Sequence, residues 1–210
     1  MKHISKHDIL NMPRLERMHL INSCGGIKSA NLIGSISKEN ISNLAVFNSV
    51  IHLGSQPPML CFMLRPTTVA RHTYDNLKST GVFTVNHIHE DFIAQAHQTS
   101  AKYEKEQSEF ETVGLEEFYI PNFQAPFVKS SSVQIGCQFV NEYHIKENDC
   151  RLIIGEIEHL RFDENIQKED GWLDLSKAKT AGIIGLDGYV ATQLMERFEY
   201  ARPGEVTKSK

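Results

Sequence analysis

Short apolar runs alternate with sharp polar turns in the first half of the chain, a pattern typical of antiparallel β-strands. Residues 25–36 and 43–54 are two such runs around the turn sequence SKEN, and polar residues between apolar runs indicate a chain reversal. Met59 to Leu64 is continuously apolar, as in a strand buried on both faces. Pro57 and Pro58 precede it. Neither can donate to a β-ladder, so we expect both at the first positions of this strand.

The period of the apolar positions changes after this strand. Val69, Tyr74 and Leu77 recur at near-helical spacing, and Gly81 follows as a residue suited to a helix C-terminus. We therefore expect a helix within residues 67–81.

Further strands follow this helix. Residues 82–88 return to a strand pattern, and residues 90–110 form a polar, charged stretch that we expect to be a helical excursion on the surface. Residues 131–145 and 150–162 are two long strand candidates around the sequence KEND, which predicts a hairpin. About six strands with few helices indicate a barrel rather than a doubly wound sheet.

The composition mainly excludes classes of protein. The chain has 210 residues and a net charge of −4, which suits one domain and disfavours a nucleic-acid surface. No run approaches the roughly 18 apolar residues of a membrane span, and the first residues lack the apolar stretch of a secretory signal. The cysteines contain no C-x-x-C pair, so we expect reduced thiols in a cytoplasmic protein: Cys24, Cys61, Cys137 and Cys150.

One candidate for chemistry is the passage from strand to helix. Two arginines and three threonines fall within nine residues there: Arg65, Thr67, Thr68, Arg71 and Thr73. A helix N-terminus offers free N–H groups and partial positive charge, and arginine and threonine add further donors, so the segment suits a phosphate. A threonine helix cap with solvated arginines explains the same residues.

A second candidate lies in residues 40–50, where amides and hydroxyls are dense within an apolar strand. Asn43, Asn48 and Ser49 are among them. Such a strand suits a flat heterocycle, with polar groups at its edge and apolar neighbours on its face. An edge strand with Asx turns is the alternative.

A metal site has little support in the sequence. His87 and His89 share one face of the strand, but no third ligand has suitable spacing, so we expect a solvated pair and no metal. Motifs for a serine hydrolase, a nucleoside triphosphatase or a dinucleotide fold are absent.

Taken together, these stretches resemble the flavin reductase-like family of FMN-binding split barrels. Residues 43–66 resemble the family's Asn-x-Ala-x-Phe-Asn-Ser core with its double proline and following Arg-Pro. Residues 71–88 resemble the helix–strand element after it, and residues 97–115 an insertion found in part of the family. Residues 125–139 and 152–162 resemble the later barrel strands.

The resemblance implies a mainly β fold: a six-stranded, Greek-key split β-barrel with peripheral helices. Residues 1–210 would form a single domain of this kind with N- and C-terminal extensions. It also implies that FMN lies in a groove, and it assigns residues to both ends of this cofactor. For the isoalloxazine and ribityl these are Asn43, Ala45, Asn48, Ser49 and Val50, and for the phosphate Arg65, Thr68, Arg71 and Thr73.

The implied function is that of an FMN-dependent oxidoreductase, an NAD(P)H-dependent flavin reductase that transfers hydride through flavin N5. NADH or NADPH would be the co-substrate, and FMN would be preferred to FAD. The flavin does the redox chemistry, so no catalytic side chain is assigned. Near the C-terminus the family's Arg-x-Gly-Gly-x-x-Tyr pattern is represented by Gly185, Gly188 and Tyr189 without the arginine. The alternative is a non-catalytic FMN-binding or electron-carrier module.

The last part of the chain bears on assembly. Residues 172–203 carry many large apolar side chains that the six strands leave without a place. They could fold back on their own barrel. The resemblance favours an isologous homodimer with each flavin site near the interface.

Overall fold

A computed structural model describes residues 1–210. It is mainly β, as the sequence predicts. The helices are α1 (Lys6–Asn11), α2 (Arg14–Cys24), α3 (His72–Thr80), η1 (Glu90–Phe92), α4 (Ile93–Gln98), α5 (Glu109–Val113) and η2 (Glu164–Ile166). The strands are β1 (Ile27–Ser29), β2 (Asn31–Ile36), β3 (Ser42–Phe47), β4 (Ile51–Ser55), β5 (Pro58–Leu64), β6 (Val82–His87), β7 (Glu117–Ile120), β8 (Phe123–Val128), β9 (Val133–Ile145), β10 (Cys150–Phe162), β11 (Ala181–Ile184) and β12 (Gly188–Ala191).

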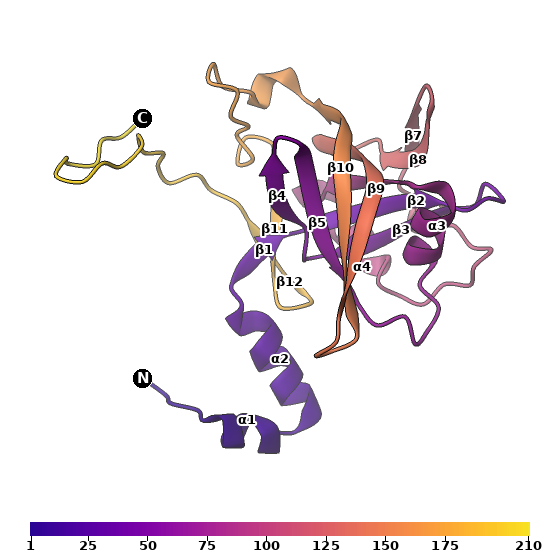
Figure 1. The fold of residues 1–210 in the computed structure, drawn as a ribbon, viewed down its shortest axis with the longest axis horizontal. Helices are drawn as coiled ribbons and strands as arrows, with labels where there is room; N and C mark the ends of the chain where they lie inside the picture. The colour runs from indigo at the N-terminus through magenta and orange to yellow at the C-terminus, as the bar shows by residue number, and fades with distance from the viewer.

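The main sheet has seven strands in the order β3-β2-β6-β9-β10-β5-β4, and all neighbours are antiparallel. Its two edge strands, β3 and β4, are consecutive in the chain and separated only by residues 48–50. The path from residue 47 to residue 51 spans at most about 14 Å. The sheet therefore curls until its edges approach each other, which makes a split barrel (Figure 1).

The seventh strand arises where the sequence pattern predicts one continuous strand. Residues 43–54 divide into β3 and β4 because the corner at Asn48–Val50 leaves the ladder. The side chains of Asn48 and Ser49 bond to backbone groups of other segments, and such bonds compete with regular strand pairing.

The proline-led strand differs in detail from the prediction. Pro58 is the first residue of β5, whereas Pro57 lies in the turn between β4 and β5. Both neighbours of β5 pair with it, yet only Cys61, Phe62 and Leu64 are buried. The first residues are more exposed because they lie beside the turn, at the free end of the β4–β5 pair.

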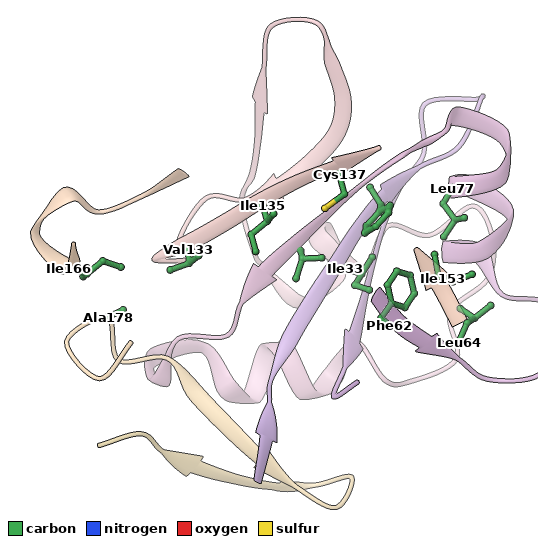
Figure 2. Close-up of a cluster of buried hydrophobic side chains, with 12 residues drawn as sticks. Ile33, Phe62, Leu64, Leu77, Val133, Ile135, Cys137, Ile153, Ile166 and Ala178 are labelled. Atoms are coloured by element: carbon green, nitrogen blue, oxygen red, sulfur yellow. The ribbon is translucent and has the colours of Figure 1, made fainter. Parts of the chain in front are cut away.

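The barrel interior holds the first of two large apolar clusters. Figure 2 shows Leu77 reaching from α3 toward Ile33 and Phe62. The ring of Phe62 packs edge-on against Phe47 and Phe83, at centroid distances of 5.1 and 5.5 Å, a geometry that aromatic pairs favour.

The second cluster lies on the other face of β2 and corrects one prediction. The stretch 90–110 is not wholly a surface excursion, because it buries Phe92, Ala96 and Phe110 against Leu32 and other residues of this cluster. Its polar residues obscure this apolar face, which is spread over three short helices. The carboxylate of Glu109 also accepts a hydrogen bond from the backbone N–H of Leu44, at 2.9 Å, on edge strand β3.

The C-terminal segment folds back in part. Strands β1, β11 and β12 form a separate sheet, and Ile183 is buried in the second cluster. Leu173 and Leu175 pack against the first cluster. Beyond β12 the chain extends away from the barrel (Figure 1) and exposes Leu194, Met195, Phe198 and Tyr200.

Two further observations concern membranes and metals. None of the helices has both the length and the apolar character needed to cross a membrane, and no cluster of three or more histidine, cysteine or acidic side chains is arranged to hold a metal ion.

The prediction of a solvated histidine pair is wrong for His87. Its Nδ1 is enclosed without a hydrogen-bond partner, and burial lowers the pKa of this histidine to about 4.

Candidate functional site

Ser49 closes the barrel at the corner between β3 and β4. Its Oγ donates to the carbonyl of Met63 at 3.2 Å and accepts from the N–H of Met63 at 3.1 Å. One hydroxyl thus satisfies both backbone groups that a neighbouring strand would otherwise bond. The corner is thereby fixed to β5 without a strand of its own.

The residues on either side of Ser49 are held by other elements. The amide of Asn48 donates to the carbonyl of Gly185, 2.9 Å away, just after β11. The carbonyl of Val50 accepts from the hydroxyl of Ser29 in β1 at 3.1 Å. Asn31 in turn donates to that hydroxyl at 2.9 Å. The corner is therefore anchored on three sides, so its backbone is pre-organised for a ligand.

A groove of about 540 Å³ lies beside this corner, within the range of roughly 300–1,000 Å³ typical of small-molecule sites. Met63 and Leu152 face each other on β5 and β10 and contribute to its apolar lining. Its apolar residues are Ile27, Val50, Ile51, Met63 and Leu152, and its polar residues are Lys28, Ser29, Asn48 and Ser49. Apolar surface with polar groups beside it suits a flat heterocycle.

The segment between β5 and α3 begins two residues beyond Met63. Arg65 and Thr68 are exposed there. Arg71 is the N-cap residue of α3 and is half-buried, with its Nε donating to the carbonyl of Pro66 at 3.3 Å. The first N–H groups of α3 have no partners within the helix, which gives this end a partial positive charge. The segment thus combines two cations with a helix start.

The sequence-predicted residues therefore fall into three places. Asn48, Ser49 and Val50 line the groove, while Arg65, Thr68 and Arg71 lie on the segment before α3. Asn43, Ala45 and Thr73 do not line the groove. Asn43 and Thr73 are buried against each other, and Ala45 is half-buried in β3 opposite Ile33.

Sequence reasoning missed six of the nine lining residues: Ile27, Lys28, Ser29, Ile51, Met63 and Leu152. Lys28 and Ser29 reach the groove through the pairing of β1 with β11, and Leu152 reaches it through the register of β10 on β5. These placements depend on tertiary pairing. Nothing in the local sequence around Lys28 or Leu152 signals a ligand.

Comparison with known proteins identifies the family. A family model described as flavin reductase like domain matches residues 28–180, which is more than half of the chain and contains most of the groove. The chain belongs to the flavin reductase like domain family. The predicted family is therefore confirmed.

Solved structures support the split-barrel fold of this flavin reductase-like protein. A protein from Shewanella frigidimarina NCIMB 400, named as a flavin reductase with a split barrel domain, is 41% identical, with 96% of this chain and 100% of that chain covered and a TM-score of 0.92. Nitrilotriacetate monooxygenase component B from Bacillus cereus is 20% identical, with coverages of 95% and 98% and a TM-score of 0.81. An FMN-binding protein from Thermus thermophilus, crystallised with 1-cyclohex-2-enone, is 14% identical, with coverages of 79% and 86% and a TM-score of 0.67.

The C-terminal hairpin of the flavin reductase-like chain adjoins the corner through Gly185. On its second strand, β12, the hydroxyl of Tyr189 lies 3.3 Å from Nδ1 of His97. Burial raises the pKa of Tyr189 to about 12, so this phenol stays protonated at neutral pH. His97 and Tyr189 therefore offer a polar pair on α4 and β12, the latter in the same small sheet as Lys28 of β1.

Proposed function

We propose that the protein binds FMN in the groove beside Asn48–Val50 and acts as an FMN-dependent oxidoreductase of the flavin reductase type. The observation that carries the proposal is the arrangement around Met63. This residue lines the apolar groove, it fixes the corner through Ser49, and it lies two residues before Arg65. A strand rises about 3.3 Å per residue, so the groove and the cationic segment are roughly 7 Å apart along β5.

At the groove, the isoalloxazine ring would pack on apolar side chains, including Met63 and Leu152. The corner would present Asn48, Ser49 and Val50 to the polar edge of the ring, partly through backbone N–H and C=O groups. Because Ser49 and Asn48 are already bonded to Met63 and Gly185, little conformational freedom is lost when a ligand binds. Asn43 and Ala45, deeper along β3, would support this surface from behind.

At the other end, the phosphate would lie beside the start of α3. Arg65, Thr68 and Arg71 have accessible side chains to donate to its oxygens, and the helix start favours an anion. The hydroxyl of Thr73 accepts from Asn43 and keeps its own proton available as a donor. These donors suit a terminal phosphate, so we propose FMN rather than FAD. The structurally similar protein from Thermus thermophilus is an FMN-binding protein, which agrees with this choice.

Bound FMN would supply hydride transfer from NADH or NADPH. The protein would bind and orient the flavin and shield it from water. No side-chain acid or base is needed for the hydride transfer. The family match and the likeness to the Shewanella protein, at 41% identity, support this reductase assignment.

We further propose that the working unit is a homodimer. Helices α1 and α2 bury no residue and project from the barrel (Figure 1). They expose Leu10, Leu15 and Ile21, while Ile27 and Ile51 are exposed at the rim of the groove. A second copy would cover these apolar surfaces and close the groove.

Steady-state oxidation of NADH and NADPH by the FMN-loaded protein tests the reductase assignment. Turnover with either nucleotide, at a rate well above that of free FMN, supports it. FMN bound at full occupancy without turnover would instead support a module that carries electrons and has no reductase activity of its own.

A further inference from the structure

A half-buried charged cluster fastens α3 to the barrel. Oε1 of Glu142, on β9, accepts hydrogen bonds from the hydroxyl of Tyr74 and from a terminal nitrogen of Arg151, each at 3.0 Å. Nζ of Lys78, one turn after Tyr74 on α3, lies 3.9 Å from the same oxygen. One carboxylate oxygen therefore gathers groups from α3 and β10.

This cluster lies at both boundaries of the proposed phosphate segment. Tyr74 directly follows Thr73 in the first turn of α3, and the guanidinium of Arg151 lies 5.3 Å from the centre of its ring. Arg151 is also the register partner of Leu64, the residue before Arg65. The cluster therefore joins the end of β5 to the start of α3, the two ends of the loop that carries Arg65, Thr68 and Arg71.

The cluster is poorly suited to a purely stabilising role. Oε2 of Glu142 and Nε of Arg151 are enclosed without hydrogen-bond partners. The side chains of Glu142 and Arg151 are only 19% and 27% exposed. Removing charges from water is unfavourable, so a pair with unsatisfied atoms contributes little net stability. Fixing a register or a geometry is the better-attested use of such pairs.

We propose that Glu142 and Arg151 are positioning residues, which hold the start of α3 and Arg65 at the separation that a bound phosphate requires. The inference rests on the proposed function, since it assumes that this loop holds the phosphate of FMN. Neither residue needs to touch the phosphate. Tyr74 connects them to the helix.

A direct electrostatic role makes the opposite prediction. Glu142 carries negative charge beside a proposed anion site, so its removal would strengthen FMN binding if only Coulomb interactions mattered. If the carboxylate acts by positioning, its removal weakens FMN binding. The direction of the change therefore separates the two roles.

The test compares FMN with riboflavin, which lacks the phosphate, by titration of flavin fluorescence with the full-length protein. For Glu142→Ala we expect FMN affinity to fall about tenfold, the equivalent of one charge-assisted hydrogen bond, with riboflavin affinity unchanged. Glu142→Gln keeps an acceptor oxygen and should recover most of the loss. Tyr74→Phe removes a single hydrogen-bond donor and should give a smaller loss of FMN affinity. This variant provides a second test if Glu142→Ala does not fold.

Asp174→Asn is the matched control. Asp174 is another mostly buried carboxylate, and it forms an ion pair with Lys168 at 3.2 Å. It is remote in sequence from the loop between β5 and α3 that would hold the phosphate. Its substitution should leave the ratio of FMN to riboflavin affinity unchanged. Tighter FMN binding by the Glu142 variants, or equal losses for both flavins, would overturn the positioning role. A wild-type protein that binds neither flavin would refute the proposed function itself.

Discussion

The amide of Asn43 donates a hydrogen bond to the hydroxyl of Thr73 across 3.1 Å, and both side chains are buried. This contact joins β3, which leads into the corner, to the second residue of α3. A fixed distance between these two elements is required if one holds the flavin ring and the other the phosphate. The bond therefore connects the two ends of the proposed FMN site.

Thr73→Val should destabilise the fold by about 1–3 kcal/mol, because it leaves the buried amide of Asn43 without its partner. Thr73→Ser keeps the hydroxyl and serves as the control, with a much smaller change in the free energy of unfolding. Urea unfolding followed by circular dichroism measures both variants. A Thr73→Val protein as stable as the wild type would show that this hydrogen bond does not stabilise the fold.

Arg65→Ala and Arg71→Ala should weaken FMN binding more than they weaken the fold. A hydrogen bond to a charged group contributes roughly 1.5–3 kcal/mol. Removal of the arginine that contacts the phosphate should therefore raise the FMN dissociation constant tenfold or more. Riboflavin affinity provides the internal control. If neither substitution changes the FMN dissociation constant, the phosphate lies elsewhere.

Elements set by neighbouring residues could be predicted from the sequence. The KEND turn joins β9 to β10, and Gly81 ends α3 with a positive φ of 77°. The corner at Asn48–Val50 could not, because its break with the ladder depends on bonds to Met63 and Gly185 that are distant in sequence. Lys28 and Leu152 enter the groove only through strand register. For His87, polarity indicated solvent, but its position at the end of β6 encloses its Nδ1.

The C-terminal tail is held by an ion pair that low pH should weaken. Asp170 accepts from Arg197 at 2.6 Å and also bonds Lys210. Hydrogen bonds from Arg197 and then Lys210 lower the pKa of this carboxyl far below its usual 3.8. A carboxyl with a depressed folded-state pKa stabilises the attachment above its ordinary pKa, and this contribution is lost as the pH falls below 3.8 toward the folded value.

Trp172 reports on this attachment, because it is the only tryptophan and the guanidinium of Arg197 lies 4.3 Å from the centre of its ring. Asp170→Asn should change the tryptophan emission at pH 7 in the same direction as acid changes that of the wild type. Glu116→Gln, which breaks the exposed pair with Lys129, should leave it unchanged. Identical emission from Asp170→Asn and the wild type would contradict the ion-pair attachment.

The proposed homodimer predicts a mass of about 48 kDa at micromolar concentration, twice the 23.8 kDa of the chain. Sedimentation equilibrium measures it directly. Leu15→Glu and Ile21→Glu place charge on the exposed face of α2 and should shift the protein toward monomer while the barrel stays folded. A wild-type monomer with full flavin occupancy would show that one chain builds the whole site.

The identity of the bound flavin shows whether the groove beside Asn48–Val50 is an FMN site. The protein is incubated with equal amounts of FMN and FAD, freed of unbound flavin, and its visible absorption spectrum is recorded before the flavin is extracted and separated by chromatography. We expect a flavin spectrum that corresponds to about one equivalent of flavin per chain, with FMN as the main extracted species. Recovery of mainly FAD, or of no flavin at all, would contradict it.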